Sequence, residues 1–246
     1  MDRVILAGGV CSDELREATG CALRAELPVR GKPAAQYVAD TLREAGGEGR
    51  TIVVGYEVAD CLTAQSGNGF VQSLGYGLEK VSSETFLLSA ADLPFLQASS
   101  VSGFLEDCDP KMALNFPIIP IEACARAYPG MKRTSMKVRE GRFTGGNIAL
   151  ANTELMRRIF PVLEQAYANR KRPLKLALQV GIGTLLKVVA GQIIPSLLPL
   201  ATLEKSVAAF LGAHVRAVIT EDADIGSDVD NLEQYNQALR ILSGSV

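Results

Sequence analysis

The stretch Val4-Ile5-Leu6-Ala7-Gly8-Gly9 decides how the chain is organised. Its apolar, β-branched start predicts a buried strand, and its paired glycines predict a sharp turn at the end of that strand. Backbone N–H groups exposed at such a turn are suited to binding an anion. The stretch therefore indicates a phosphate-binding loop, with an ordinary turn after a strand as the alternative.

Further segments alternate between strand and helix. Residues 34–45 carry apolar side chains at helical spacing and stop at Gly46-Gly47, and residues 51–55 form a β-branched run typical of a strand buried on both faces. A strand, a helix and a strand in this order imply a right-handed parallel crossover. Further strands are predicted at 85–89, 111–116 (ended by Pro117), 147–151 and 215–219, and further helices at 97–108 and 153–169. The pattern predicts an α/β fold with a parallel sheet covered by helices.

Length and composition limit the classes of protein. A chain of 246 residues with 48% hydrophobic content can bury a full core, and we expect one domain over 1–246 with a helical apolar insertion at about 153–212. A net charge of −2 gives no general attraction to nucleic acid, so no nucleic-acid partner is expected. Five cysteines without a CxxC pair indicate neither a disulfide framework nor a zinc site. The start of the chain has no signal-peptide pattern, which favours the cytoplasm.

The most apolar stretch spans residues 174–203. Lysines and prolines interrupt it, so we expect no membrane span. The apolar positions between Leu174 and Val189 fall on one helical face. Such a face is typical of a helix buried in the core or in a homodimer interface.

The first part of the chain combines LAGG at 6–9, LRAELPVRGKP at 23–33 and the helical run that stops at Gly46-Gly47. In this combination the chain resembles the MobA-like (molybdopterin-guanylyltransferase-like) branch of the nucleotidyltransferases, relatives of the sugar-phosphate nucleotidyltransferases. The resemblance implies the nucleotide-diphospho-sugar transferase type of α/β fold, which has three layers: a Rossmann-like mixed and mostly parallel sheet with helices on both faces. The family usually has a lysine where this chain has Arg24. The positive charge is therefore kept, but it is carried by a planar guanidinium group and not by the compact ammonium group of lysine.

The resemblance also implies the residues of the site. Asp92, just past the strand at 85–89, matches the family's Asp-x-Pro, whose Asp holds Mg²⁺; a turn or helix cap is the alternative from the residues alone. Arg24, Asp92 and, as a weaker candidate, Arg16 are the expected catalytic residues. The residues expected to bind nucleotide or second substrate are Leu6, Ala7, Gly8, Gly9, Gly67, Asn68, Gly69, Ser73 and Asn147.

An acidic segment, residues 221–230, precedes the last predicted helix. Helix capping alone accounts for such a cluster. The segment also resembles the family's late Asp-x-Asp/Asn, which implies Asp230 as a second metal ligand and Asp228 as its support. Residues 132–142 hold five basic residues against one acidic residue and predict a solvated hairpin, with a clamp for an acceptor phosphate as the alternative.

The function implied is Mg²⁺-dependent transfer of a nucleoside monophosphate from a nucleoside triphosphate to a phosphorylated small-molecule acceptor, with release of pyrophosphate. Such chemistry depends on positioning and charge neutralisation, so the absence of a triad around the single His214 does not oppose it. One alternative is a GT-A-like glycosyltransferase that uses Asp228-Val229-Asp230 and a sugar nucleotide. Another is a non-catalytic nucleotide-binding regulatory protein. A dinucleotide oxidoreductase is disfavoured because residues 8–11 lack the GxGxxG spacing.

Overall fold

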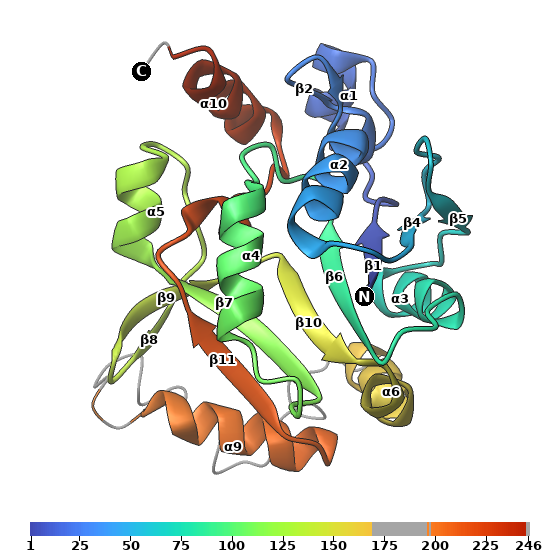
Figure 1. Ribbon diagram of the computed structural model, residues 1–246. Helices are drawn as coiled ribbons and strands as arrows, with labels where there is room; N and C mark the ends of the chain where they lie inside the picture. Colours follow the sequence, from blue (N-terminus) through green and yellow to red (C-terminus); the bar gives the residue numbers. More distant parts are fainter. Residues whose placement is uncertain (169–195, 197, 245–246) are drawn as a thin grey trace.

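The computed structural model describes residues 1–168, 196 and 198–244. Within these residues a nine-stranded sheet forms the centre of the molecule (Figure 1). Its strands are β1 (Asp2–Leu6), β4 (Thr51–Val54), β5 (Leu62–Ala64), β6 (Thr85–Ala90), β7 (Leu114–Pro120), β8 (Met136–Val138), β9 (Gly141–Gly145), β10 (Ile148–Asn152) and β11 (Val215–Ile219). A separate pair, β2 (Pro28–Val29) and β3 (Lys32–Pro33), forms a small hairpin.

The strands follow the order β5-β4-β1-β6-β10-β7-β9-β8, and β11 pairs with β7. Only β9 and β10 of this described sheet run against the direction of the other strands. The sheet is therefore mixed and mostly parallel, as the sequence predicts. The parallel crossover expected from the first two strands is confirmed, because β1 pairs in parallel with both β4 and β6.

Helices cover both faces of the sheet (Figure 1). They are α1 (Asp13–Thr19), α2 (Ala34–Gly46), α3 (Phe70–Glu79), α4 (Ala98–Asp107), α5 (Ile121–Ala127), α6 (Thr153–Ala168), α9 (Leu200–Leu211) and α10 (Leu232–Leu242). Short 3-10 turns, η1 (Arg24–Glu26) and η3 (Ala223–Gly226), stand in the connections. Helix α2 begins at Ala34, the first residue of the predicted helical run, with Pro33 as its N-cap.

Two apolar layers hold the helices on the sheet. On one face Leu42 of α2 and Phe104 of α4 belong to the same buried cluster as Ile5 of β1. On the other face Leu74 of α3 packs in a cluster with Val4 of β1, together with residues of α6 and α9. Neighbouring residues of β1 thus face opposite layers, as the alternation of side chains along a strand requires. Burial of each such side chain contributes about 1.5 to 3 kcal/mol to the hydrophobic stabilisation.

Strand β7 corrects one prediction. The predicted strand over Lys111–Phe116 ends at Pro117, whereas β7 begins at Leu114 and runs through Pro117 to Pro120. At this point β7 changes its antiparallel partner from β10 to β9. Gly146, in the turn between those two strands, donates its N–H to the Pro117 carbonyl at 2.9 Å. The missing N–H of proline therefore falls where the ladder is already interrupted.

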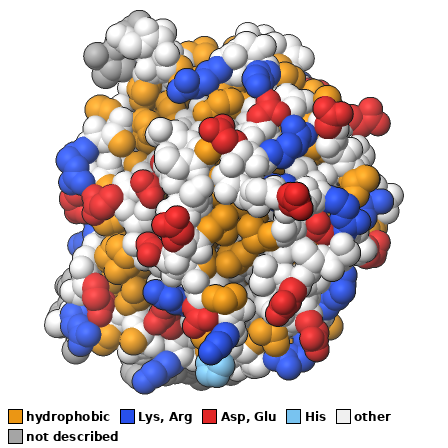
Figure 2. Space-filling view, in the orientation of Figure 1, with side chains coloured by type: hydrophobic (Ala, Val, Ile, Leu, Met, Phe, Trp, Pro, Cys, Tyr) orange, Lys and Arg blue, Asp and Glu red, His pale blue; other side chains and the backbone are white. Residues whose placement is uncertain are grey.

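Part of the apolar region predicted between 153 and 212 is visible as α6 and α9. The helical face predicted from Leu174 to Val189 lies outside the described residues. In the part of the chain that the structure describes, no helix has the length and apolar character needed to cross a membrane. Acidic and basic side chains are interspersed on the face shown in Figure 2.

A glycine in α3 permits its close approach to the sheet. A Cβ atom at Gly77 would lie 2.7 Å from Val4 Cγ1 and 3.0 Å from Val54 Cγ2. We expect Gly77→Ala to lower the free energy of unfolding by about 1 to 2 kcal/mol, because overpacking exceeds the gain in helix propensity. Urea denaturation measures the change.

The matched control is Gly103→Ala in α4, where an added Cβ meets no atom within 4 Å. This substitution should raise the stability by up to about 1 kcal/mol, since alanine is the better helix former. Equal stabilities of the two variants would contradict the close packing of α3 on β1 and β4.

Candidate active site

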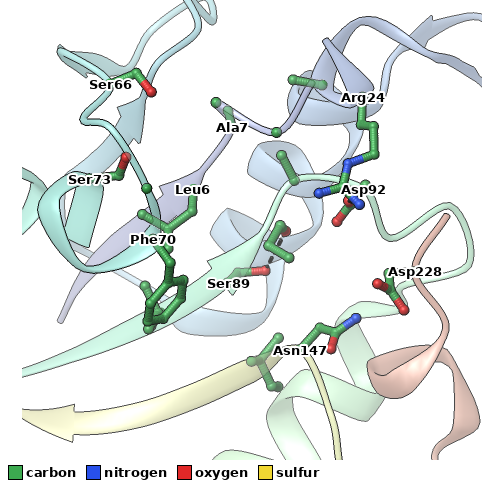
Figure 3. Close-up of a pocket in the computed structure, with 18 of the residues that line it drawn as sticks. Leu6, Ala7, Arg24, Ser66, Phe70, Ser73, Ser89, Asp92, Asn147 and Asp228 are labelled. Carbon is green, nitrogen blue, oxygen red and sulfur yellow. Dashed lines mark hydrogen bonds and ion pairs between the residues drawn. The ribbon is translucent and has the colours of Figure 1, made fainter. Parts of the chain in front are cut away.

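A pocket of about 670 Å³ lies where β1 and β6 end (Figure 3). Parallel strands that end at one edge of a sheet bring their following loops together there. The residues predicted from the sequence that line this pocket are Leu6, Ala7, Gly8, Gly9, Arg24, Gly67, Asn68, Gly69, Ser73, Asp92, Asn147, Asp228 and Asp230. They come from the turns after β1 and β6, from η1, from the start of α3, from the turn before β10 and from the loop before α10.

The turn after β1 presents unpaired backbone donors. Ala7 makes the last ladder bond, to the Val54 carbonyl at 2.8 Å, and no hydrogen bond from the N–H of Gly8, Gly9 or Val10 occurs among the described residues. A Cβ atom at Gly9 would lie 2.7 Å from Arg24 Nη2, so a side chain there would displace the guanidinium. The turn can therefore offer its N–H groups to an anion in the pocket.

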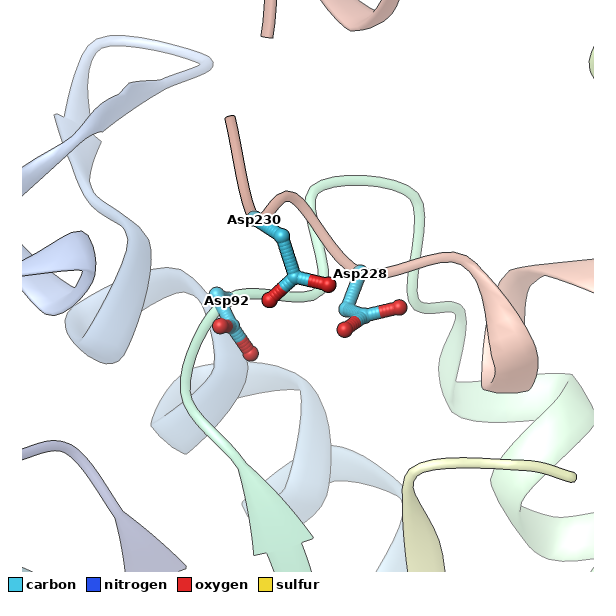
Figure 4. Close-up of side chains that lie close together, drawn as sticks. All are labelled: Asp92, Asp228 and Asp230. Carbon is cyan, nitrogen blue, oxygen red and sulfur yellow. The ribbon is translucent and has the colours of Figure 1, made fainter. Parts of the chain in front are cut away.

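Three carboxylates gather beside this turn (Figure 4). One oxygen from each of Asp92, Asp228 and Asp230 lies within 4.8 Å of the others. Asp92 follows β6 and is 7% exposed, while the other two stand in the loop between η3 and α10. Val229 donates its N–H to the Asp92 carbonyl at 3.1 Å. This backbone bond holds the late acidic loop against the end of β6.

Two guanidinium groups compensate the three negative charges. Arg24 Nη1 contacts Asp92 Oδ2 at 3.2 Å and also forms an ion pair with Asp230 Oδ1. Arg133 forms an ion pair with Asp228. The Nε atom of Arg24 is buried and has no partner among the described residues. An anion bound at the turn after β1 would supply an acceptor for donors of this kind.

Burial raises the pKa of Asp92 to about 6. Arg24 opposes this shift because its positive charge favours the carboxylate, whereas the negative charge of Asp228 adds to it. Asp92 is thus a carboxylate kept close to protonation by its surroundings, and a cation placed beside it would lower that pKa.

The donor set fits a magnesium ion. Mg²⁺ prefers hard oxygen ligands and is usually held by one or two carboxylates together with water and substrate phosphates. Asp92, Asp228 and Asp230 supply carboxylate oxygens in one place, at the border of the pocket and near the free N–H groups.

Arg16 is the one predicted catalytic residue that the structure does not bring to the pocket. It lies on α1, its side chain is 57% exposed, and it pairs with Asp13 of the same helix at 2.8 Å. It is absent from the pocket lining. The loop between Gly9 and Arg24 folds into a helix, which carries Arg16 outward, so we drop Arg16 as a catalytic candidate.

Several lining residues have no counterpart in the sequence analysis. Ser66 and Phe70 flank the predicted segment 67–69, and a prediction that included the neighbours of that loop would have found them. Ser89 and Phe116 lie within strands, and their position at the pocket depends on the pairing of distant strands. Figure 3 shows Asn147 in the same part of the pocket as Ser89 and Asp228.

Comparison with known proteins identifies the family. A family model described as MobA-like NTP transferase domain matches residues 3–129, more than half of the chain. The chain belongs to this family. The resemblance drawn from LAGG and LRAELPVRGKP is thereby confirmed, and the protein is a nucleotidyltransferase. The matched range contains Gly8, Gly9, Arg24 and Asp92.

Solved structures share the fold over nearly the whole chain. A hypothetical transferase from Thermus thermophilus is 34% identical, with a TM-score of 0.84, over 95% of this chain and 98% of the other. A 2-C-methyl-D-erythritol 4-phosphate cytidylyltransferase, also from Thermus thermophilus, is 18% identical, with a TM-score of 0.57, over 99% and 100% of the chains. A CMP:2-keto-3-deoxy-manno-octonic acid synthetase complexed with CTP is 13% identical, with a TM-score of 0.58, over 100% and 99%. None of the curated proteins matches the chain.

The raised pKa of Asp92 makes stability depend on pH. Without metal, the folded state holds a proton on Asp92 up to about pH 6, above the ordinary value of 3.8. The energetic cost of the buried charge is absent below pH 4 and complete above pH 6. In EDTA, Asp92→Asn should therefore exceed the wild type in stability by about 2 to 3 kcal/mol at pH 8 and lose this advantage at pH 4. Urea unfolding at several pH values measures the difference.

Asp13→Asn on the exposed surface of α1 serves as the control, with an expected change below about 0.5 kcal/mol. A gain in Asp92→Asn of the same size at pH 4 and pH 8 would contradict the raised pKa.

Proposed function

We propose that the protein transfers a nucleoside monophosphate from a nucleoside triphosphate to a phosphorylated small-molecule acceptor, with Mg²⁺ bound and pyrophosphate released. The observation that carries the proposal is the position of three mutually close carboxylates beside a turn whose N–H groups have no partner among the described residues, within one pocket. Family membership supports nucleotide transfer, and the three carboxylates support the metal.

The turn after β1 binds the triphosphate in this proposal. The N–H groups of Gly8 and Gly9 donate to oxygens of the β- and γ-phosphates. The guanidinium of Arg24 lies between Gly9 and the carboxylates. From this position its positive charge offsets the negative charge that develops on the leaving pyrophosphate. Gly67, Asn68, Gly69 and Ser73 form the wall that faces the base and ribose.

The carboxylates form the metal site. Asp92 and Asp230 would hold Mg²⁺, with Asp228 beside them. A bound ion would supply positive charge that offsets the negative charge of the phosphates. Asn147, in the turn before β10, faces the acceptor in this proposal, and its position near Ser89 and Asp228 supports that role. The acceptor phosphate or hydroxyl attacks the α-phosphorus, and the bond to pyrophosphate breaks.

Nucleotide binding can be tested by thermal unfolding with ATP, GTP, CTP or UTP, each with and without Mg²⁺. We expect one triphosphate to stabilise the protein in a Mg²⁺-dependent manner, by about 2.7 kcal/mol at a hundred times its dissociation constant. Stabilisation by a sugar nucleotide in place of every triphosphate would instead indicate a glycosyltransferase. Stabilisation by a triphosphate that ignores Mg²⁺, with no turnover, would indicate a regulatory protein.

Substitutions test the catalytic residues in an assay of pyrophosphate release over a panel of sugar phosphates. Asp92→Ala and Arg24→Ala should each lower kcat/KM by about a hundredfold or more, because each removes a charge that the reaction needs. Arg24→Lys should retain activity, since the charge remains.

Arg16→Ala is the matched control, because Arg16 is an arginine of the same first loop region that stands outside the pocket. It should keep full activity. Full activity of Asp92→Ala would remove Asp92 from the site, and equal activity of Arg24→Ala and Arg24→Lys would remove the role given to Arg24.

A further inference from the structure

We propose that Arg133 is a positioning residue that holds Asp228 in place as a third carboxylate of the metal site. The inference rests on the function proposed above. It assigns a role to a residue of the basic stretch 132–142, whose sequence predicts a solvated hairpin or a clamp for an acceptor phosphate.

Arg133 contacts both the side chain and the backbone of Asp228. Its Nη1 forms an ion pair with Asp228 Oδ1, and its Nη2 donates to the Asp228 backbone carbonyl at 2.7 Å. A planar guanidinium that binds a carboxylate and a backbone carbonyl of one residue fixes both the side chain and the local backbone. The Arg133 side chain is only 7% exposed, so water screens this contact little.

Arg133 acts through Asp228 because it does not reach the pocket. Asp228 lines the pocket, whereas Arg133 is absent from the lining. Its neighbour Lys132 has a side chain that is 90% exposed. Two adjacent basic residues of this stretch therefore differ in environment: Arg133 is buried against Asp228, whereas Lys132 is exposed to solvent.

The charges of the site give this contact its importance. Arg24 contacts Asp92 and Asp230, and within the described residues Arg133 is the one cation in an ion pair with Asp228. Without Arg133, repulsion from the two nearby carboxylates would turn Asp228 away from them.

A contribution to folding stability does not by itself explain why an arginine is buried at position 133. Its Nε atom is buried and lacks a partner among the described residues, so the desolvation of this atom is not compensated there. Buried ion pairs can often be replaced by apolar side chains without loss of stability. The geometry points instead to the orientation of Asp228.

The test uses Mn²⁺ alone as a spectroscopic probe, with free Mn²⁺ measured by electron paramagnetic resonance in a titration of the protein without nucleotide, because a triphosphate would itself bind the ion. Arg133→Gln should weaken Mn²⁺ binding about tenfold or more, the usual effect of losing a partner that orients a metal ligand. Lys132→Gln, the exposed neighbour, should bind Mn²⁺ as the wild type does. In the background of Asp228→Asn, Arg133→Gln should cause no further loss.

Circular dichroism shows whether Arg133→Gln is folded. Arg133→Lys is a second variant that keeps the test decisive if Arg133→Gln does not fold. Lysine keeps the charge but cannot make both contacts, so we expect Mn²⁺ affinity between those of the wild type and Arg133→Gln. Wild-type affinity in either Arg133 variant, or an equal loss in the Asp228→Asn background, would overturn the inference while leaving the metal site intact. Failure of the wild type itself to bind Mn²⁺ would overturn the proposed metal site as well.

Discussion

Three carboxylates within 4.8 Å of one another are the constraint on which this site depends. Negative charges at this separation repel strongly where water is excluded, and burial of Asp92 adds to the cost. The chain meets this cost with two arginines from separate loops, Arg24 beside Asp92 and Asp230, and Arg133 beside Asp228. Such a cluster is unfavourable as a structural device alone and is suited to a multivalent cation with its phosphate ligands.

The strand order of the sheet brings these groups together. The parallel strands β1 and β6 end side by side, so the Gly8-Gly9 turn and Asp92 face one pocket. The reversed strand β10 begins at the same edge and brings Asn147 there, where its carbonyl accepts the N–H of Ala90 at 2.9 Å. The change of partner along β7 at Pro117 leaves room for the turn that carries Asn147. Strand direction and the site are thus consequences of one topology.

The sequence predicts the parts of this site whose signals are local. Gly8 and Gly9 follow an apolar run, and Asp92 follows another, so each is visible as a group at the end of a buried strand. Other features depend on the tertiary structure. Arg16 is carried away by a helix in the first loop, Phe116 reaches the pocket through the continuation of β7 past Pro117, and Arg133 turns inward from a stretch that is mostly solvated. Charge and composition alone do not distinguish an inward arginine from its exposed neighbours.

The contact of Arg24 with Asp230 joins residues 206 positions apart. Closing a loop of that length costs conformational entropy before the contact contributes anything. During synthesis from the N-terminus, β1, β4 and β6 emerge long before the loop that carries Asp228 and Asp230, so the Gly8-Gly9 turn can form while the acidic cluster is still incomplete. The complete cluster is therefore among the last features that the folding chain acquires, and a chain that ends before residue 220 would keep the turn but lack two of the three carboxylates.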